Sequence, residues 1–319
     1  MHLRFANIFV FSGLVLLLGA GCNVTGNNSP SPRGGEAYEP GDQRLRDPYG
    51  NNSALTTQGI TADSGAVFVA IGGWNSCVED PRIPGQPSPW GMNMNKGFSK
   101  LVKQLQARSN GQPVKFVMAC HNPDASVARY VLSTDPSRLR VGPHNQMYQE
   151  IGQFAQSTNS PVVILGHSYG GAFAMQAALA MPPQVAIAQL LTIDGISPVN
   201  CPPATMAKLL VDRLSQITGL GDSSGGGIGC QQSPREFNAS QKQTIRGRVG
   251  WWQNYHQNDL LSILKADAIP EACNTPVKHD DIKSFINGHI AMGMYDKLWR
   301  DITSRLTSPI PAGCLAAPI

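Results

Sequence analysis

The sequence predicts an α/β fold in which a mostly parallel sheet is covered by helices on both faces. From about residue 60 onward, apolar runs of strand length alternate with runs of helix-forming residues. This alternation is typical of parallel sheets, whose strands are buried on both faces by the connecting helices. A second observation is the stretch 161–179, which joins a strand to a helix through a tight, glycine-rich turn. The 319 residues can hold one large domain, and we find no internal repeat.

Most of the expected strands, helices and loops can be assigned from local patterns in the sequence. The segment 97–109 is amphipathic, because Phe98, Leu101, Val102 and Leu105 fall on one helical face. The segment 77–92 contains four prolines and is expected to be irregular, and 219–229 is a glycine-rich loop. We expect strands over 66–71, 114–119, 162–165, 185–193 and 248–252, and helices over 97–109, 145–156, 172–180, 205–217, 234–245 and 290–306.

The N-terminus has the pattern of a secretory signal. Arg4 precedes an apolar run over 8–18, and small residues follow at 19–21 before Cys22. The apolar run is too short to remain as a membrane span. The small residues ending in Cys22 resemble a bacterial lipobox, which implies lipidation of Cys22; secretion with cleavage near Ala20 is the alternative. We therefore expect a signal at 1–21, a flexible linker at 22–58 rich in Asn, Ser, Pro and Gly, and a domain at 59–319.

The cysteines also favour export. Apart from Cys22 there are six, an even number that suggests disulfides in an oxidising compartment. None forms a C-x-x-C pair, so we expect no zinc or other metal site. Pairing in chain order is our expectation. The predicted disulfides are Cys77–Cys120, Cys201–Cys230 and Cys273–Cys314. The net charge of +4, without a basic cluster, indicates no nucleic-acid partner.

The turn at 166–171 places Ser168 between an apolar strand and a helix. This is the context that a G-x-S-x-G nucleophile elbow requires. The helix that follows would direct its first N–H groups toward an oxyanion at the serine. A second match to the same pattern surrounds Ser223, but no apolar strand precedes it and no helix-forming run follows. We therefore take Ser168, rather than Ser223, as the candidate nucleophile.

A serine needs a base, and the base needs an acceptor that holds its tautomer. When the serine stands on such an elbow, the acid and then the histidine follow it in the chain. His289 lies in a loop directly before the last predicted helix, and is our candidate base. His279, in a polar loop, and His256, beyond a strand end, remain possible bases.

The acid and the oxyanion donors are sought at other strand ends. Asp194 ends the apolar strand that follows the elbow helix and is the candidate acid; Asp259, after the 248–252 strand, is the alternative. One oxyanion donor should be the backbone N–H of Tyr169, the residue after the nucleophile. The second should come from the loop after the 66–71 strand, from Trp74 or otherwise Gly73.

The 166–171 elbow, the Gly72-Gly73 strand end, Asp194 and the His289 loop resemble the α/β-hydrolase superfamily over about residues 60–308. The resemblance is closest to exported bacterial lipases and esterases, which implies an acyl ester as substrate and no cofactor. No antiparallel strands are evident before the 66–71 strand. That departure from the fuller pattern predicts a sheet shortened at its N-terminal edge.

These features predict a serine hydrolase that cleaves carboxylic esters through an acyl-enzyme on Ser168. Thioester or amide cleavage by the same residues is one alternative, and a non-catalytic envelope binding protein on a hydrolase scaffold is another. The segments 77–92 and 201–230 could each form a lid or an ordinary surface loop. The expected location is the bacterial envelope, with a lipid on Cys22 as membrane anchor, or otherwise the secreted fraction.

Overall fold

The computed structural model describes the greater part of the predicted domain. The described residues are 65–80, 83–92, 94–109, 111–121, 127–199, 201, 234, 236–257, 266–277, 289 and 292–306. The predicted signal and linker, with Cys22, lie outside them, as do the helix expected at 205–217 and the loop at 219–229. Among the helices that are described, none has the length and apolar character needed to cross a membrane.

The centre of the domain is an eight-stranded sheet with the order β10-β9-β8-β7-β1-β4-β5-β6. The six strands from β10 to β4 are parallel, and β5 and β6 add an antiparallel hairpin at one edge. The strands are β1 (Val67–Ile71), β4 (Lys115–His121), β5 (Val127–Leu132), β6 (Asp135–Pro143), β7 (Val162–His167), β8 (Ile187–Ile193), β9 (Val249–Gln257) and β10 (Cys273–Val277). A separate two-stranded sheet pairs β2 (Val78–Asp80) with β3 (Ile83–Ser88).

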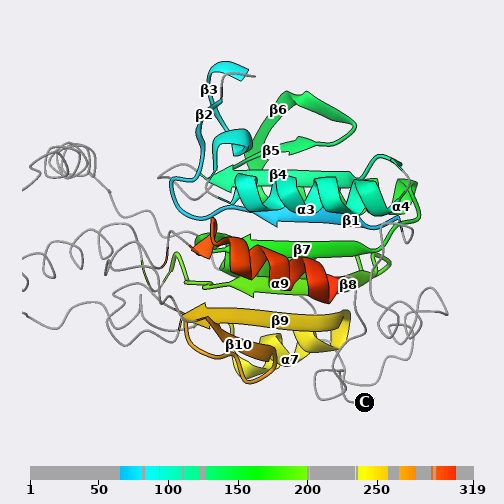
Figure 1. Cartoon of the computed structure of the whole chain (residues 1–319). Helices are drawn as coiled ribbons and strands as arrows, with labels where there is room; N and C mark the ends of the chain where they lie inside the picture. The colour runs from blue at the N-terminus through cyan, green and yellow to red at the C-terminus, as the bar shows by residue number, and fades with distance from the viewer. Residues whose placement is uncertain are drawn as a thin grey trace, which may run out of the picture. The chain divides into compact units, whose positions relative to one another are not determined.

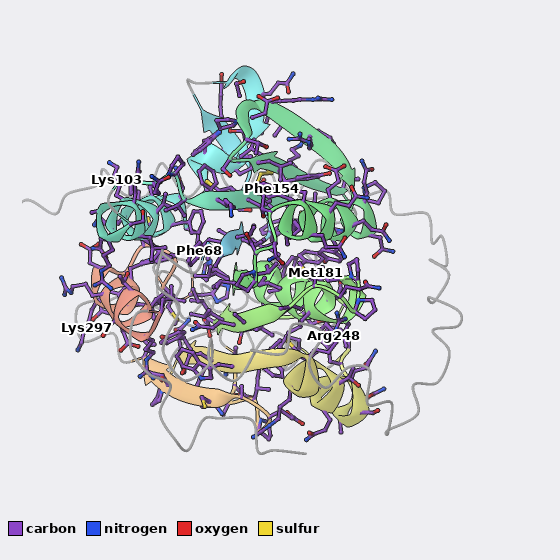
Figure 2. All side chains as sticks on the ribbon, turned by 90° about the vertical axis from the view of Figure 1, so that its right-hand side faces the viewer. Phe68, Lys103, Phe154, Met181, Arg248 and Lys297 are labelled. Atoms are coloured by element: carbon purple, nitrogen blue, oxygen red, sulfur yellow. A yellow bond between two sulfur atoms is a disulfide. The ribbon has the colours of Figure 1, made fainter. Side chains whose placement is uncertain are left out.

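Helices cover both faces of the large sheet. In Figure 2, α3 and α9, marked by Lys103 and Lys297, lie on one side, and α4, α5 and α7, near Phe154, Met181 and Arg248, lie on the other. Figure 1 shows α3 and α9 running across the front of the sheet. The helices are α3 (Asn95–Arg108), α4 (His144–Ser157), α5 (Tyr169–Ala180), α7 (Ala239–Arg248) and α9 (Asp296–Leu306), with a short 3₁₀ turn, η4 (Pro89–Gly91).

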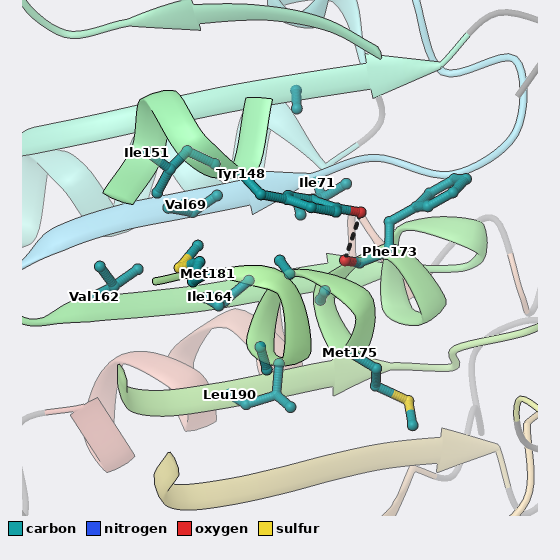
Figure 3. Close-up of a cluster of buried hydrophobic side chains, with 14 of the residues drawn as sticks. Val69, Ile71, Tyr148, Ile151, Val162, Ile164, Phe173, Met175, Met181 and Leu190 are labelled. Carbon is teal, nitrogen blue, oxygen red and sulfur yellow. Dashed lines mark hydrogen bonds between the residues drawn. The ribbon is translucent and has the colours of Figure 1, made fainter. Parts of the chain in front are cut away.

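The core has two layers, because successive residues of β1 point to opposite faces of the sheet. Val69 and Ile71 face α4 and α5, whereas Phe68 and Ala70 face α3 and α9. Figure 3 shows Tyr148 of α4 over the β1 side chains, with its hydroxyl donating to the Phe173 carbonyl at 3.1 Å. A helix that is apolar all round must be buried on every side, and nearly all of α5 is buried. The helix that carries the elbow is therefore held rigidly.

The predicted fold class is confirmed: the chain has an α/β architecture with a mostly parallel sheet covered on both faces, consistent with the α/β-hydrolase fold. Residues 1–64 lie outside the described residues, so the predicted lack of antiparallel strands before β1 stays a prediction. The sheet extends beyond β4, because the β5–β6 hairpin, which we did not predict, occupies that edge. Four of the six residues in β5 and one of the nine in β6 are buried, and Arg129 interrupts β5, so neither strand has a continuous apolar run.

Other boundaries also differ from prediction. The segment expected to be irregular at 77–92 contains β2, β3 and η4, and β10 was not predicted. The last helix, α9, begins at Asp296 because a turn at Gly293 and Met294 interrupts the chain before it. Met294 is 41% exposed, so it does not belong to the apolar stripe that Leu298, Ile302 and Leu306 form.

One of the three predicted disulfides is confirmed. Cys77 and Cys120 are bonded, and they join the loop after β1 to the end of β4. Cys201 and Cys273 are each in a disulfide as well. Their predicted partners, Cys230 and Cys314, lie outside the described residues, so these two pairings stay predictions.

Candidate active site

The candidate site lies where β7 and β8 end side by side. Ser168 directly follows β7, and Asp194 directly follows β8. The two strands are parallel and paired up to His167 and Ile193, so both polar side chains stand at the carboxyl edge of the sheet. In open α/β sheets this is the edge at which ligands bind.

Ser168 has a strained backbone, with φ 59° and ψ −128°. Hydrogen bonds hold this conformation: its N–H donates to the Ile193 carbonyl at 3.1 Å, and its own carbonyl accepts from Gly171 and Ile196. The turn also requires glycine, because a Cβ on Gly170 would stand 2.0 Å from the Ile71 carbonyl oxygen. Strain of this kind persists only when the surrounding structure enforces it, and it is common at active sites.

His289 connects Ser168 to Asp194. Its Nε2 lies 2.7 Å from Ser168 Oγ, and its Nδ1 lies 2.6 Å from Asp194 Oδ2. Since an ionised carboxylate only accepts, Nδ1–H of His289 donates to Asp194. In the neutral ring Nε2 then has a free lone pair and accepts a hydrogen bond from the hydroxyl of Ser168. All three side chains are at most 6% exposed, so this chain of hydrogen bonds is shielded from water.

The Asp194 carboxylate is held from several sides. Oδ1 accepts from the backbone N–H of Ala266 at 2.6 Å, and Gln257 Nε2 donates to Oδ2 beside His289. Burial alone would raise the pKa of this carboxyl. The charge of His289 and the hydrogen bonds from His289, Ala266 and Gln257 outweigh it and hold the pKa below its usual value. Asp194 is therefore ionised and aligned with His289 at neutral pH.

The structure thus brings together the three residues that the sequence suggested as nucleophile, base and acid. His256, also considered as the base, is a half-buried residue of β9, and the contact to Ser168 Oγ comes from His289 instead. His279, Asp259 and Ser223 lie outside the described residues.

Of the two expected oxyanion donors, Tyr169 directly follows Ser168 in the chain, and Trp74 is one residue beyond Gly73, which approaches Ser168 closely. Tyr169 is the first residue of α5, so its N–H has no acceptor within the helix. Trp74 follows Gly73 in the loop after β1. That loop lies close to Ser168, because a Cβ on Gly73 would be 2.5 Å from the Ser168 Cβ and 2.9 Å from Oγ. A side chain at position 73 would occupy the space beside the hydroxyl.

Sequence reasoning missed two side chains that support the site. Gln257, the last residue of β9, contacts the Asp194 carboxylate, and its place at a strand end was the available signal. His167, inside the elbow motif itself, donates from Nε2 to the His289 carbonyl at 2.7 Å. Through this bond the residue before the nucleophile holds the backbone of the candidate base.

Two buried histidines at the site should make the protein sensitive to mild acid. Burial, the main cause, and the charge of His289 lower the pKa of His167 to about 4. Burial and the charge of His144 lower the pKa of His121 to about 3. Both pKa values are below the unfolded value of 6.5, so between pH 6.5 and 4 the unfolded chain binds protons that the folded chain does not. Stability is therefore complete above pH 6.5 and is lost as the pH falls.

The expected loss in the free energy of unfolding approaches about 1.4 kcal/mol per pH unit for each histidine. Urea unfolding at pH 7.5, 6.0 and 5.0 measures it, in a range where most exposed carboxyls remain ionised. His167→Asn removes one of the two histidines, so its free energy of unfolding should fall with pH at about half of the wild-type slope. A free energy of unfolding that stays constant from pH 6.5 to 5.0 would contradict the prediction.

Comparison with known proteins gives little further guidance. No protein-family model matches the chain, and no curated protein matches it in sequence. Among solved structures it is similar to naproxen esterase (carboxylesterase NP) from Bacillus subtilis, at 10% identity and a TM-score of 0.35. That alignment covers 84% of this chain and 98% of the esterase.

Within the described residues, no three histidine, cysteine or acidic side chains are grouped so that they could hold a metal ion.

Proposed function

We propose that the protein is a serine hydrolase that cleaves carboxylic esters through an acyl-enzyme on Ser168. The observation that carries the proposal is the hydrogen-bonded chain from Ser168 through His289 to Asp194, at the carboxyl edge of the sheet. A hydroxyl held by a buried histidine and carboxylate in this order is the arrangement that activates serine for acyl transfer.

In the first step Ser168 Oγ attacks the acyl carbon while its proton passes to His289 Nε2. The carbonyl π electrons move to the oxygen, and the N–H groups of Tyr169 and Trp74 stabilise the oxyanion. His289 then gives its proton to the departing alkoxide, which leaves the acyl group on Ser168. Water, deprotonated by His289, releases the acid by the same route. The Asp194 carboxylate stabilises the imidazolium in both steps.

The proposal includes export to a bacterial envelope. The signal-like N-terminus with Cys22 supports it, and so does the Cys77–Cys120 disulfide, since such bonds persist in oxidising compartments. A lipid on Cys22 would then anchor the domain to a membrane through the 22–58 linker. Mass spectrometry of the mature N-terminus distinguishes a lipidated Cys22 from an unmodified end near Ala20.

A fluorophosphonate probe and a matched set of ester, thioester and amide substrates test the activity. We expect the probe to label Ser168, and p-nitrophenyl esters to turn over faster than the other two classes. A series of acyl chain lengths then identifies the acyl group. Faster thioester or amide cleavage would replace the ester assignment. If Ser168 is not labelled and no substrate turns over, the non-catalytic binding protein is the better account.

A further inference from the structure

Three stacked rings lie beside the candidate site and have no part in the mechanism above. They are His121 at the end of β4, His144 at the start of α4 and Phe173 of α5. The Phe173 ring stacks on His121 at 4.3 Å and on His144 at 4.1 Å between centroids. Figure 3 shows Phe173 at the end of the sheet toward which the strands run. His121 is completely buried, so its ring is held in one orientation.

The hydrogen bonds of this group set the tautomer of His121. Its Nδ1 lies 2.9 Å from the Gly72 carbonyl oxygen, which only accepts, so Nδ1–H donates. Its Nε2 lies 2.8 Å from His144 Nε2, and in the neutral ring it must accept from that nitrogen. The lowered pKa of His121 keeps its ring neutral at physiological pH. The bonds therefore run in one direction, from His144 through His121 to Gly72.

The end of β4 also holds the rest of the 72–77 loop. The His121 N–H donates to Ser76 Oγ at 3.2 Å, and the His121 carbonyl accepts from the Cys77 N–H at 3.3 Å. At the start of the loop, the Gly72 N–H donates to the Ala119 carbonyl at 2.8 Å. The Cys77–Cys120 disulfide closes its far end. The His121 side chain itself reaches the peptide beside Ser168, through its bond to the Gly72 carbonyl.

That peptide joins Gly72 to Gly73. Because a trans peptide is planar, the direction of the Gly72 carbonyl determines the opposite direction of the Gly73 N–H, the backbone donor directly before Trp74. Two glycines in succession have little steric preference of their own, and the peptide between them could rotate if its carbonyl were free. The bond from His121 removes this freedom beside Ser168.

We propose that His121 is a positioning residue, which holds the 72–77 loop in the orientation that presents its backbone N–H groups to the oxyanion at Ser168. This inference rests on the proposed function, because it assigns a role in stabilising that oxyanion. A misdirected donor loses most of its value in the transition state, where the charge develops, and little in substrate binding.

Three substitutions separate this role from packing. His121→Asn places an amide nitrogen near the position of Nδ1 and can still donate to Gly72. His121→Gln has the same amide one bond farther from the backbone, so it can reach His144 but not Gly72. His121→Phe keeps a stacked ring without any donor. All three are compared with wild type in ester hydrolysis, after thermal unfolding has shown that they fold.

We expect kcat to fall on the order of 10- to 100-fold in His121→Gln and His121→Phe, with KM changed less than about threefold. The kcat of His121→Asn should stay within about threefold of the wild-type value. The affinity for an alkyl boronic acid, whose tetrahedral adduct carries an oxyanion-like oxygen, should decrease in parallel with kcat/KM. If His121→Phe does not fold, the Asn and Gln pair decides the question.

The outcomes distinguish the two proposals. An active wild type with equal kcat in the Asn and Gln variants, whether retained or lost, overturns the positioning role and leaves the hydrolase assignment intact. A wild type that neither hydrolyses any ester nor reacts with a fluorophosphonate overturns the proposed function, and this inference is rejected with it.

Discussion

Ser168→Ala is expected to reduce the kcat for p-nitrophenyl ester hydrolysis by at least about 10⁴-fold. The change removes the attacking oxygen, so no acyl-enzyme can form, while Oγ is the only heavy atom lost. The small cavity and the lost bond to His289 should alter the melting temperature little. Initial rates at saturating ester measure the effect, and the absence of label from a fluorophosphonate confirms the position attacked.

Ser223→Ala is the matched control, because Ser223 lies in the other G-x-S-x-G sequence of the chain. We expect it to retain the wild-type rate. A Ser168→Ala protein that hydrolyses esters as fast as wild type would refute the nucleophile. Loss of activity in Ser223→Ala alone would transfer the assignment to the second motif.

Asp194→Asn should have the second largest effect, a reduction in kcat on the order of 10³- to 10⁴-fold. Both carboxylate oxygens accept hydrogen bonds, one from the Ala266 N–H and the other from His289 and Gln257. An amide has a single acceptor oxygen, so in either orientation its NH₂ group meets a donor. Turned toward His289, it would favour the tautomer with the proton on Nε2, which cannot accept the proton of Ser168.

The same mismatch leaves a buried donor unpaired, so Asp194→Asn should also lower the free energy of unfolding by about 1–3 kcal/mol. Kinetics at a temperature well below unfolding separate the two effects. Asp259→Asn is the matched control and tests the second candidate acid directly. Greater loss of kcat in Asp259→Asn than in Asp194→Asn would show that Asp259 is the acid.

Most of the sheet and its helices could be predicted because their signals are local. The apolar run before Ser168 and the helix after it follow from periodicity and turn chemistry within some twenty residues. The β5–β6 hairpin escaped prediction since its residues are largely half-buried or exposed, and an edge hairpin lacks the apolar run of a central strand. Likewise, a turn at Gly293 and Met294 precedes α9. In the sequence, Met294 continues the four-residue spacing of Leu298, Ile302 and Leu306, so the pattern gives no sign of this turn.

The sequence by itself determined the fold class and the elbow at Ser168, and it limited the acid and the base to a few residues. Only the tertiary structure placed His289 and Asp194 in one hydrogen-bonded chain with Ser168. His289 is 121 residues from Ser168 and 95 from Asp194, and it can bond to both because β7 and β8 end at the same level of the sheet and place these two residues side by side. His121 and Gly72, 49 residues apart, meet for the same reason at the ends of β4 and β1. A hydrogen bond depends on distance and direction within about 3 Å, and strand register brings residues that are far apart in the sequence within that range.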